Sequence, residues 1–524
     1  MARIVMTVML HMHTSHRFAK SFGVLASMVR VSLGVALGLS PSCALDDGMQ
    51  DPAADPAMDP ATEEGEGGAL AVCTTGPIRC HAQVRTFGAE RRMAPHAAPL
   101  AATPIGFGPP DLQAAYKIDP TRLATATKPT VAIVDAYGYP KLEADLAVYR
   151  SQYGLPACTI ANGCLKIVNQ QGLTTNLPPA PPANDDWTIE TALDVDMASA
   201  ACPLCNILVV QATNNAGDGL DIGQNVAATL GATVISDSWG GVEVPNQAQA
   251  YATEDATYFV HPGIAIFVAA GDSGFNDTIS TGRPTGPEYP ASSAHTIAVG
   301  ATRLVRDPTS TRGWKETAWA VTPLAAGGPD VSRGAGGSGC SLSIPKPAYQ
   351  TASPCQFKAS ADIAAVGDPA TGVAVYNTNN TNPGWISVGG TSAAAPFVAA
   401  IFAATGNGNQ SSGSFIAASA AKLWDVTAGS NGTCAAQPLL CNAAAGWDGP
   451  TGFGTPNVSA FMPPPVGGGS GSGNGSGAGN GNGSGNGSDS GDDDLVGGCA
   501  VGGSGSSAAG LLLGLALLGI RRRR

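Results

Sequence analysis

The strongest constraint on the fold is a series of short, apolar segments that are separated by stretches with helical spacing. Segments that are apolar throughout must be covered on both faces, which is typical of parallel strands. The predicted strands are Thr130–Asp135, Cys164–Val168, Ile207–Gln211, Thr233–Ser236, Ile264–Ala269 and Thr296–Val299. Predicted helices between or before them are Leu112–Tyr116, Lys141–Arg150 and Trp187–Ala201. The sequence therefore predicts an α/β fold, with its active site outside the carboxyl ends of the strands.

The predicted globular domain spans residues 105–461 of the 524 in the chain. Residues 1–44 are typical of an export signal: basic residues precede the apolar run Val31–Leu39, and Ser42-Cys43-Ala44 offers small residues for cleavage. Lipid modification of Cys43 is an alternative, although Ser40-Pro41-Ser42 matches that signal poorly. We therefore expect an extracellular protein, either secreted or retained at the cell surface.

Residues 45–104 are acidic at first and then rich in alanine and proline. Such a composition predicts a stretch that buries no core. We interpret it as a linker or a short propiece.

The chain after residue 461 changes composition again. Residues 462–498 are rich in Gly, Ser and Asn, which predicts a flexible linker. Residues 499–524 contain the apolar stretch Ala508–Ile520 and end in Arg521–Arg524. This stretch is short for a stable membrane span of about 20 residues, yet it predicts transient or stable membrane contact. A disordered tail is the alternative.

Cysteine spacing agrees with export. Of the 12 cysteines, all but Cys43 and Cys499 fall into local couples. These couples are Cys73/Cys80, Cys158/Cys164, Cys202/Cys205, Cys340/Cys355 and Cys434/Cys441. An even set in an exported chain predicts disulfides that close short loops. Zinc at Cys202 and Cys205 is the alternative, but no second CxxC or histidine pair accompanies them.

The charge balance excludes nucleic acid as a partner. The formal net charge is -12 and only 13% of residues are charged, whereas phosphate binding needs a basic face. We expect protein or peptide partners and a monomeric chain.

The small-residue stretch Gly389–Pro396 precedes the apolar run Phe397–Phe402. This pattern predicts a tight turn followed by a buried helix, with Ser392 at the helix N-terminus. Unpaired N–H groups there favour negative charge on a serine oxygen or a nearby carbonyl oxygen. Ser392 is therefore a candidate nucleophile, and an ordinary N-cap is the alternative.

Two acids lie four residues apart on the helix Trp187–Ala201. Glu190 and Asp194 share one face of this mostly apolar helix, where like charges repel. Their burial is tolerable if one of them holds a proton, which would make the pair a proton relay. A solvated acidic edge is the alternative, and Asp196 fits either interpretation.

A further acid follows the strand that ends near Ala270. Asp272 lies in Gly271-Asp272-Ser273-Gly274, at the mouth of a buried strand. A carboxyl group kept protonated there can donate a hydrogen bond to an oxyanion. The alternative is an ordinary turn residue.

Histidines are scarce in the predicted domain. Of seven in the chain, only His261 and His295 lie within residues 105–461. His261 precedes a Pro-Gly turn and His295 begins a strand, so we interpret both as structural. If Ser392 is a nucleophile, a carboxylate must accept its proton.

This combination resembles the sedolisins, the serine-carboxyl peptidases, over roughly residues 105–460. The resemblance rests on three motifs in order, namely Glu190-x-x-x-Asp194, Ala269-Ala-Gly-Asp272-Ser-Gly274 and Gly389-Gly-Thr-Ser392-Ala-Ala-Ala-Pro396. It implies a subtilisin-like, mostly parallel sheet flanked by helices on both faces. It also implies that Ser392 attacks the scissile carbonyl, Glu190 accepts the proton, Asp194 supports Glu190, and protonated Asp272 donates to the oxyanion. Such an endopeptidase works best in acid.

The resemblance extends to a calcium ion and to two neighbouring residues. It implies one Ca²⁺ bound by carboxylates of Asp425 and Asp448 and by carbonyls of Val426, Ala444 and Gly446. Asp135, which ends the first strand, is by resemblance an auxiliary hydrogen-bonding partner at most. Trp239 is either a substrate-lining residue or ordinary core.

Both ends of the chain bear on this resemblance. Sedolisins usually have a long folded propeptide, whereas only about 60 residues lie between the predicted signal and this predicted domain, so maturation by autocleavage stays open. Cys73–Cys80 is then a remnant that stays attached. The tail resembles C-terminal surface-sorting signals of myxobacterial exported proteins.

Three hypotheses remain. The first is an acid serine-carboxyl endopeptidase, and the second is a catalytically silent binding module with the same fold. A Ser-His-Asp peptidase is the third, disfavoured because no histidine stands in the required helix-start motif. An intact set of Glu190, Asp194, Asp272 and Ser392 separates the first from the second.

Overall fold

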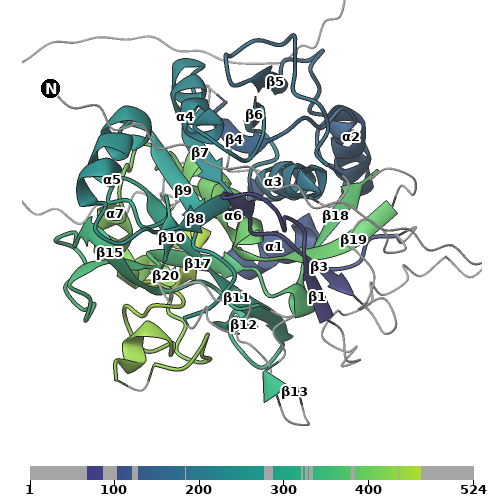
Figure 1. Ribbon diagram of the computed structural model, residues 1–524. Coiled ribbons are helices and arrows are strands. Elements are labelled where there is room, and N and C mark those ends of the chain that lie inside the picture. The colour runs from purple at the N-terminus through teal and green to yellow at the C-terminus, as the bar shows by residue number, and fades with distance from the viewer. Residues whose placement is uncertain are drawn as a thin grey trace, which may run out of the picture. The chain divides into compact units, whose positions relative to one another are not determined.

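The computed structural model of the chain describes ten segments, which lie within the compact unit Met1–Met462 and are shown in Figure 1. They are residues 68–86, 103–120, 128–182, 185–275, 287–319, 323–324, 328–329, 334–378, 384–434 and 436–461. The predicted signal peptide (1–44) and the predicted linker and tail (462–524) lie outside these segments.

An eight-stranded sheet forms the centre, in the order β12-β11-β9-β7-β4-β6-β5, with β17 also paired to β11. Its strands are β4 (Thr130–Ala136), β5 (Leu165–Asn169), β6 (Asn206–Ala212), β7 (Val234–Asp237), β9 (Ala265–Ala269), β11 (Ile297–Asp307), β12 (Gly313–Ala318) and β17 (Ile363–Val366). All neighbouring pairs are parallel except β11 with β12. The predicted parallel sheet is therefore confirmed, with one antiparallel edge strand.

Eight α-helices accompany the sheet among the described residues. They are α1 (Pro109–Tyr116), α2 (Leu142–Gln152), α3 (Trp187–Ala201), α4 (Gly219–Thr229), α5 (Ala248–Glu254), α6 (Thr391–Ala404), α7 (Ser414–Ala418) and α8 (Val458–Phe461). None of these described helices is long and apolar enough to cross a membrane.

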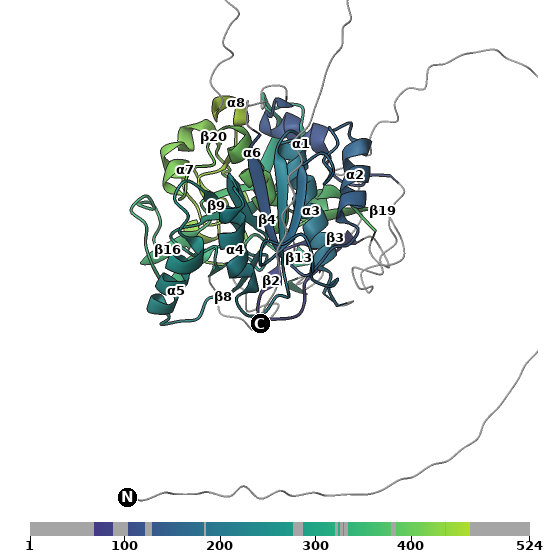
Figure 2. The same cartoon turned by 90° about the horizontal axis from the view of Figure 1, so that it is seen from above.

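Helices cover both faces of the sheet. Consecutive residues of β4 point to opposite faces. On one face Val134 lies against Gly223 of α4, so closely that a Cβ at Gly223 would come within 2.5 Å of the valine Cγ1. On the other face Asp135 lies among the acids of α3. The sheet is thus packed between layers of helices, as Figures 1 and 2 show.

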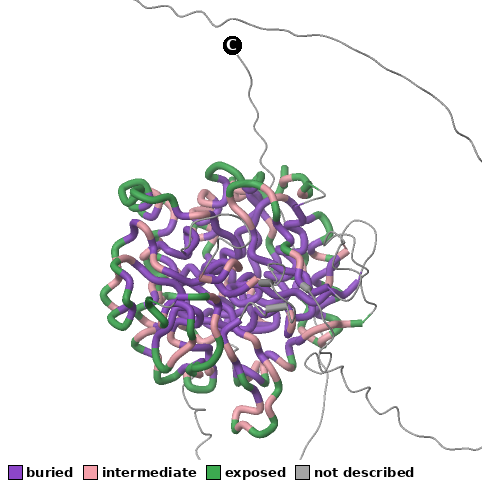
Figure 3. The backbone as a smooth tube through the Cα atoms, turned by 60° about the horizontal axis from the view of Figure 1, so that its bottom comes forward, coloured by how far each residue is buried: buried purple, intermediate pink, exposed green. Residues whose placement is uncertain are grey.

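Helices α3 and α6 form the centre of the second helical layer. They pack against each other and against β4, and every residue of both helices is buried. Figure 3 shows this buried interior and the exposed loops around it. Because small alanine side chains dominate α6, the two backbones can approach closely. That packing brings residues from distant parts of the sequence together.

Two smaller sheets join the beginning of the described chain to the rest. One has the order β1-β3-β19-β18 and the other the order β10-β8-β2. Their strands are β1 (Gly68–Ala71), β2 (Arg79–Cys80), β3 (Gln83–Thr86), β8 (Trp239–Val242), β10 (Glu288–Tyr289), β18 (Val373–Asn377) and β19 (Gly384–Gly389). Three two-stranded ladders complete the fold: β13 (Pro323–Leu324) with β14 (Gly328–Pro329), β15 (Gly339–Pro345) with β16 (Phe357–Ser360), and β20 (Leu423–Trp424) with β21 (Thr455–Pro456).

The expectation that residues 45–104 bury no core is wrong for residues 68–86. Val72, Cys73, Cys80, Ala82 and Val84 belong to the main hydrophobic cluster. Acidic and proline-rich neighbours dominate the composition of the longer stretch and conceal this short folded piece. The same residues 68–86 also contact the site that is described below.

All five predicted cysteine couples are disulfides. Their partners lie 7, 6, 3, 15 and 7 residues apart along the chain. Cys202 is bonded to Cys205, so the zinc alternative is wrong, because a disulfide offers no thiolate to a metal.

Candidate active site

Ser392 lies where the sequence predicts it, in the first turn of α6. Gly390 precedes the helix with φ of 100°, a conformation that L side chains rarely adopt. The Ser392 hydroxyl donates to the carbonyl oxygen of Ser238 at 3.2 Å. It accepts a hydrogen bond from the backbone N–H of His81 at 3.1 Å. The serine is fully buried, so it is held between fixed partners.

Glu190 and Asp194 face this serine from α3. Both side chains are fully buried, so the alternative of a solvated acidic edge is wrong. An oxygen of Glu190 accepts from the N–H of Ala82 at 3.0 Å, and an oxygen of Asp194 accepts from the Ser238 hydroxyl at 2.8 Å. Ser238 therefore contacts both Ser392 and Asp194.

Burial raises the pKa of both acids well above their ordinary values. The neighbouring Asp135 raises the pKa of both further, and the nearby hydroxyl of Ser392 lowers that of Glu190. Glu190 also raises the pKa of Asp194. Carboxyls coupled in this way share their protons and titrate as a group.

Asp135 is the third member of this acid cluster. It is the last residue but one of β4 and is fully buried. Burial raises its pKa to about 7, against a smaller lowering by the Thr191 hydroxyl. Its neighbours are carboxyls and a threonine from α3. Asp135 thus lies beside both Glu190 and Asp194.

Asp196, on the same helix, lies away from Ser392. Its carboxylate accepts from the backbone N–H of Tyr376 at 3.3 Å, and burial raises its pKa well above the ordinary value. The structure therefore separates it from Glu190 and Asp194.

Asp272 lies in the turn after β9, beside the start of α6. One carboxyl oxygen accepts from the backbone N–H and the hydroxyl of Thr391, at 2.8 and 2.9 Å. The other accepts from the side-chain amide of Gln83 at 3.0 Å. Burial raises the pKa of Asp272 to about 6, while His81 and these hydrogen bonds lower it. Asp272 is thus fixed to the first residue of α6, the helix that carries Ser392, and is more than a turn residue.

Residues of the early segment complete the site, and the sequence did not predict them. The backbone of His81 and Ala82 contacts Ser392 and Glu190, and the His81 ring lies 3.3 Å from a carboxylate oxygen of Glu288. In the sequence, the only signal that this segment folds is the cysteine pair Cys73/Cys80, whose second member lies in Arg79-Cys-His-Ala-Gln-Val-Arg85.

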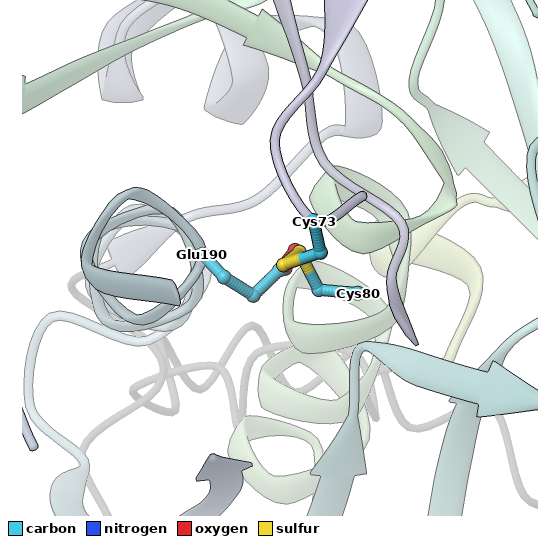
Figure 4. Close-up of side chains that lie close together, drawn as sticks. All are labelled: Cys73, Cys80 and Glu190. Carbon is cyan, nitrogen blue, oxygen red and sulfur yellow. A yellow bond between two sulfur atoms is a disulfide. The ribbon is translucent and has the colours of Figure 1, made fainter. Parts of the chain in front are cut away.

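The disulfide Cys73–Cys80 lies directly against Glu190, as Figure 4 shows. One potential ligand atom from each of these three residues lies within 4.8 Å of the others. Since both sulfurs are bonded to each other, the group is no metal site. It is a contact between the early segment and the acid pair.

The structure also gives the surroundings of three other residues considered in the sequence, namely Trp239, His261 and His295. Trp239 is buried and its indole N–H donates to the carbonyl oxygen of Val134 at 2.8 Å, so its side chain belongs to the core. His295 is exposed and His261 is partly exposed. Among the described histidines, His81 is the one that contacts Ser392.

The predicted calcium residues gather in one loop region. Asp425 accepts from the N–H of Gly446 at 3.0 Å, and Asp448 accepts from the N–H of Ala444 at 2.9 Å. Burial raises the pKa of Asp448 to about 7, and the charge of Asp425 contributes. Two carboxylates that repel each other in one loop region offer the oxygen ligands that a hard cation such as Ca²⁺ prefers.

Comparison with known proteins agrees with this architecture. The sequence model of the Subtilase family (Peptidase S8) matches residues 184–454. Kumamolisin from Bacillus sp. (strain MN-32) is 30% identical over 376 residues, which cover 68% of this chain and 63% of that protein. Sedolisin from Pseudomonas sp. (strain 101) is 27% identical over 384 residues, covering 68% and 61%. The chain thus spans less than two thirds of the length of these relatives.

A solved structure of Pseudomonas sedolisin, a serine-carboxyl proteinase complexed with two molecules of pseudo-iodotyrostatin, is similar in fold. It superposes with a TM-score of 0.52 at 24% identity, covering 68% of this chain and 97% of that one. The predicted subtilisin-like fold is therefore confirmed.

Proposed function

The chain belongs to the subtilase family, and from this premise we propose that it is a serine-carboxyl endopeptidase that hydrolyses protein substrates in acid. Serine-carboxyl chemistry replaces the usual histidine base with a carboxylate. One observation carries the proposal: the buried Ser392 at a helix start contacts Ser238, which also donates to Asp194, one acid of a buried pair.

The acid pair supplies the base. Glu190 lies close enough to Ser392 for the hydroxyl to affect its pKa, so it can accept the hydroxyl proton as the oxygen attacks a substrate carbonyl. Asp194 shares charge with Glu190 and is fixed by Ser238. An acyl-enzyme forms when Glu190 returns the proton to the leaving nitrogen, and water then hydrolyses it.

The ring of His81 is unsuited to the role of base. Its backbone N–H points at Ser392, while a nitrogen of its imidazole faces Glu288 at 3.3 Å. These contacts argue against a Ser-His-Asp mechanism, although Asp135 stands where such an enzyme would carry its aspartate.

Asp272 supplies the charge stabilisation. Its carboxyl is anchored to Thr391, the residue before the nucleophile. In protonated form it can donate to the oxygen that becomes negative when Ser392 attacks. Because its pKa is about 6, the donor form persists below that pH and is lost above it.

Calcium would act on stability. Asp425, Asp448 and the backbone carbonyls of Val426, Ala444 and Gly446 would hold one ion, which would neutralise the repulsion between the two carboxylates. The residues fit such an ion, and none of them lies among the contacts of Ser392 given above.

Export and surface retention rest on the sequence alone. The apolar run before residue 44 and the disulfide-rich domain favour an extracellular protein, and the terminal arginines favour a tail that contacts the membrane. We propose that the protein acts outside the cytoplasm, as a monomer, on protein or peptide substrates.

The test is cleavage of an unfolded protein between about pH 2 and pH 8. Wild type is compared with Ser392→Ala and Glu190→Gln. We expect activity that peaks in acid and is lost in both variants.

Two matched controls make the same chemical changes elsewhere. Ser151→Ala changes an exposed serine and Glu143→Gln a partly exposed glutamate, and both should keep wild-type activity. Cleavage that survives Ser392→Ala, or that peaks near neutral pH and ignores Glu190→Gln, would refute the mechanism.

A further inference from the structure

The structure assigns Asn431 as a positioning residue that holds the turn of Asp272, and with it the group proposed to stabilise the oxyanion. The inference rests on the proposed peptidase function, and it adds a residue that lies outside the contacts of Ser392 and the acid pair. Three observations carry it: the freedom of the turn, the segment that braces the turn, and the hydrogen bonds by which Asn431 ties the two together.

The turn that carries Asp272 has little stiffness of its own. Gly271 and Gly274 enclose it with φ of 104° and 66°, and glycine leaves the chain its widest choice of conformations. Thr391 anchors the N–H of Gly271 and the carboxyl of Asp272. The downstream side of the turn must therefore be fixed by other residues.

Residues 334–338 run alongside the turn and brace its backbone. The N–H of Ala335 donates to the carbonyl oxygen of Asp272 at 3.0 Å, and the N–H of Gly274 donates to the carbonyl oxygen of Ala335 at 2.9 Å. Three of these five bracing residues are glycines. The brace therefore needs a support of its own.

The side chain of Asn431 supplies that support. Its amide nitrogen donates to the carbonyl oxygen of Gly336 at 2.6 Å and to the hydroxyl of Ser338 at 2.8 Å. An asparagine amide has two N–H donors, so these two bonds use both of them. Because Asn431 is buried, solvent does not compete for either bond.

The backbone of Asn431 holds the turn directly. Its carbonyl oxygen accepts from the N–H of Phe275 at 3.1 Å. The same oxygen lies so close to the turn that a Cβ at Gly274 would come within 2.3 Å of it. Asn431 therefore contacts the turn through its main chain and the brace through its side chain, and it sets the spacing between them.

Asn431 is itself held by a stiff loop. Its N–H donates to the carbonyl oxygen of Cys441 at 2.9 Å, and Cys441 is bonded to Cys434. The hydroxyl of Ser338 donates to the carbonyl oxygen of Leu440, the residue before that cysteine, at 2.6 Å. The turn of Asp272 is thus tied, through Asn431, to a loop that a covalent bond closes.

The position of the turn matters because Asp272 must reach the oxygen that becomes negative. A donor stabilises an oxyanion at about 2.7–3.1 Å, and a misplacement of about 1 Å can cost about 100-fold in rate. Asn431 acts on this distance through Asp272. Its loss should therefore slow the chemical step and leave substrate binding unchanged.

The experiment replaces the amide of Asn431 by an apolar group of similar size. Asn431→Leu removes both donors, and Asn169→Leu is the matched control. Asn169 is also buried and its amide donates to two backbone carbonyls, those of Thr175 and Asn176, but it lies on β5 at the far edge of the central sheet. In full-length chains, kcat and KM are measured in acid with a quenched fluorescent peptide, chosen from the sites that wild type cuts in an unfolded protein.

We expect Asn431→Leu to lower kcat by about 10- to 100-fold, with KM within about twofold of wild type. Asn169→Leu should keep the wild-type kcat. A double-mutant cycle tests the route: in an Asp272→Ala background, Asn431→Leu should cost less than about twofold, because the group that it positions is gone.

A milder variant covers the case in which Asn431→Leu does not fold, which thermal unfolding shows. Ser338→Ala removes one of the two hydrogen bonds of the Asn431 amide. It should lower kcat by about fivefold, as expected for one hydrogen bond, and this loss should also vanish in the Asp272→Ala background.

The outcomes separate this inference from the proposed function. If wild type cleaves and Ser392→Ala does not, the peptidase function stands. A kcat of Asn431→Leu or Ser338→Ala that equals that of Asn169→Leu, or a loss that multiplies with that of Asp272→Ala, would then overturn the role of Asn431 alone. If wild type shows no cleavage that depends on Ser392, both proposals fail.

Discussion

Replacing Asp135 by asparagine tests whether the buried acids are held in protonated form. Burial raises the pKa of this carboxyl from 3.8 to about 7. The folded chain therefore binds the proton about a thousandfold more tightly than the unfolded chain, which is about 4 kcal/mol at about 1.4 kcal/mol per tenfold. Because the group is fully buried, solvent does not screen this effect.

The direction in which stability changes with pH follows from the raised pKa of Asp135. Below pH 3.8 the carboxyl is protonated in both states, so the folded chain suffers no penalty. As the pH rises towards about 7, the unfolded chain releases its proton and wild type loses stability, whereas the asparagine variant does not. Relative to wild type, the free energy of unfolding of Asp135→Asn should therefore rise by up to about 4 kcal/mol between pH 3.5 and pH 8.

The assay is guanidinium unfolding, followed by tryptophan fluorescence, at both pH values. A Ser392→Ala background prevents self-digestion, and Asp218→Asn, at an exposed residue, controls for the loss of a charge. This gain in stability reflects the cluster of Asp135, Glu190 and Asp194 as a whole, because the three carboxyls titrate together. A stability difference between the two chains that is the same at pH 3.5 and pH 8 would refute the reasoning.

Three further predictions concern the proposed site and its support. Activity should fall as pH rises through about 6, where Asp272 loses its proton. Asp272→Asn, which still donates, should remove that step from the pH profile of kcat/KM, whereas Asp272→Ala should lose about 100-fold. Chelation by EDTA should lower the Tm of wild type, and in Asp448→Asn the Tm should no longer respond to calcium; an unchanged wild-type Tm would argue against the ion. Gly390→Ala should lower stability by about 1–3 kcal/mol in thermal unfolding, because φ is 100° there and the new Cβ would meet the His81 carbonyl oxygen; a neutral effect would contradict this contact.

The central sheet was predictable because each strand carries its own signal. Thr130–Asp135 and Ile264–Ala269 are apolar and bounded by turn residues, and they became β4 and β9 within one residue at each end. The disulfides were equally local, since their partners lie at most 15 residues apart. The remaining predicted strands also occur in the sheet, although β11 extends well beyond Val299.

The burial of Glu190 and Asp194 was beyond local prediction. Their spacing defines one face of a helix, but it does not say what covers that face. The cover comes from α6 and from the early segment, far away in the sequence.

The early segment was missed for a similar reason. His81 contacts Ser392 across 311 residues of chain, and no local pattern encodes such a pairing. Composition taken over residues 45–104 is dominated by acidic and proline-rich repeats, which outweigh the short folded stretch. The sequence leaves two roles open for Trp239, and the hydrogen bond from its indole N–H to Val134 places its side chain in the core.

The short reach of the disulfides has a consequence for any cut in the chain. In the described residues each disulfide joins cysteines at most 15 positions apart, so none ties one half of the domain to the other. A single break outside these small loops leaves two pieces that only non-covalent packing holds together. The bond between His81 and Ala82 is such a place, because Cys73 and Cys80 both precede it. A chain cut there should run as one species in a native gel and as two in detergent, even without a reducing agent.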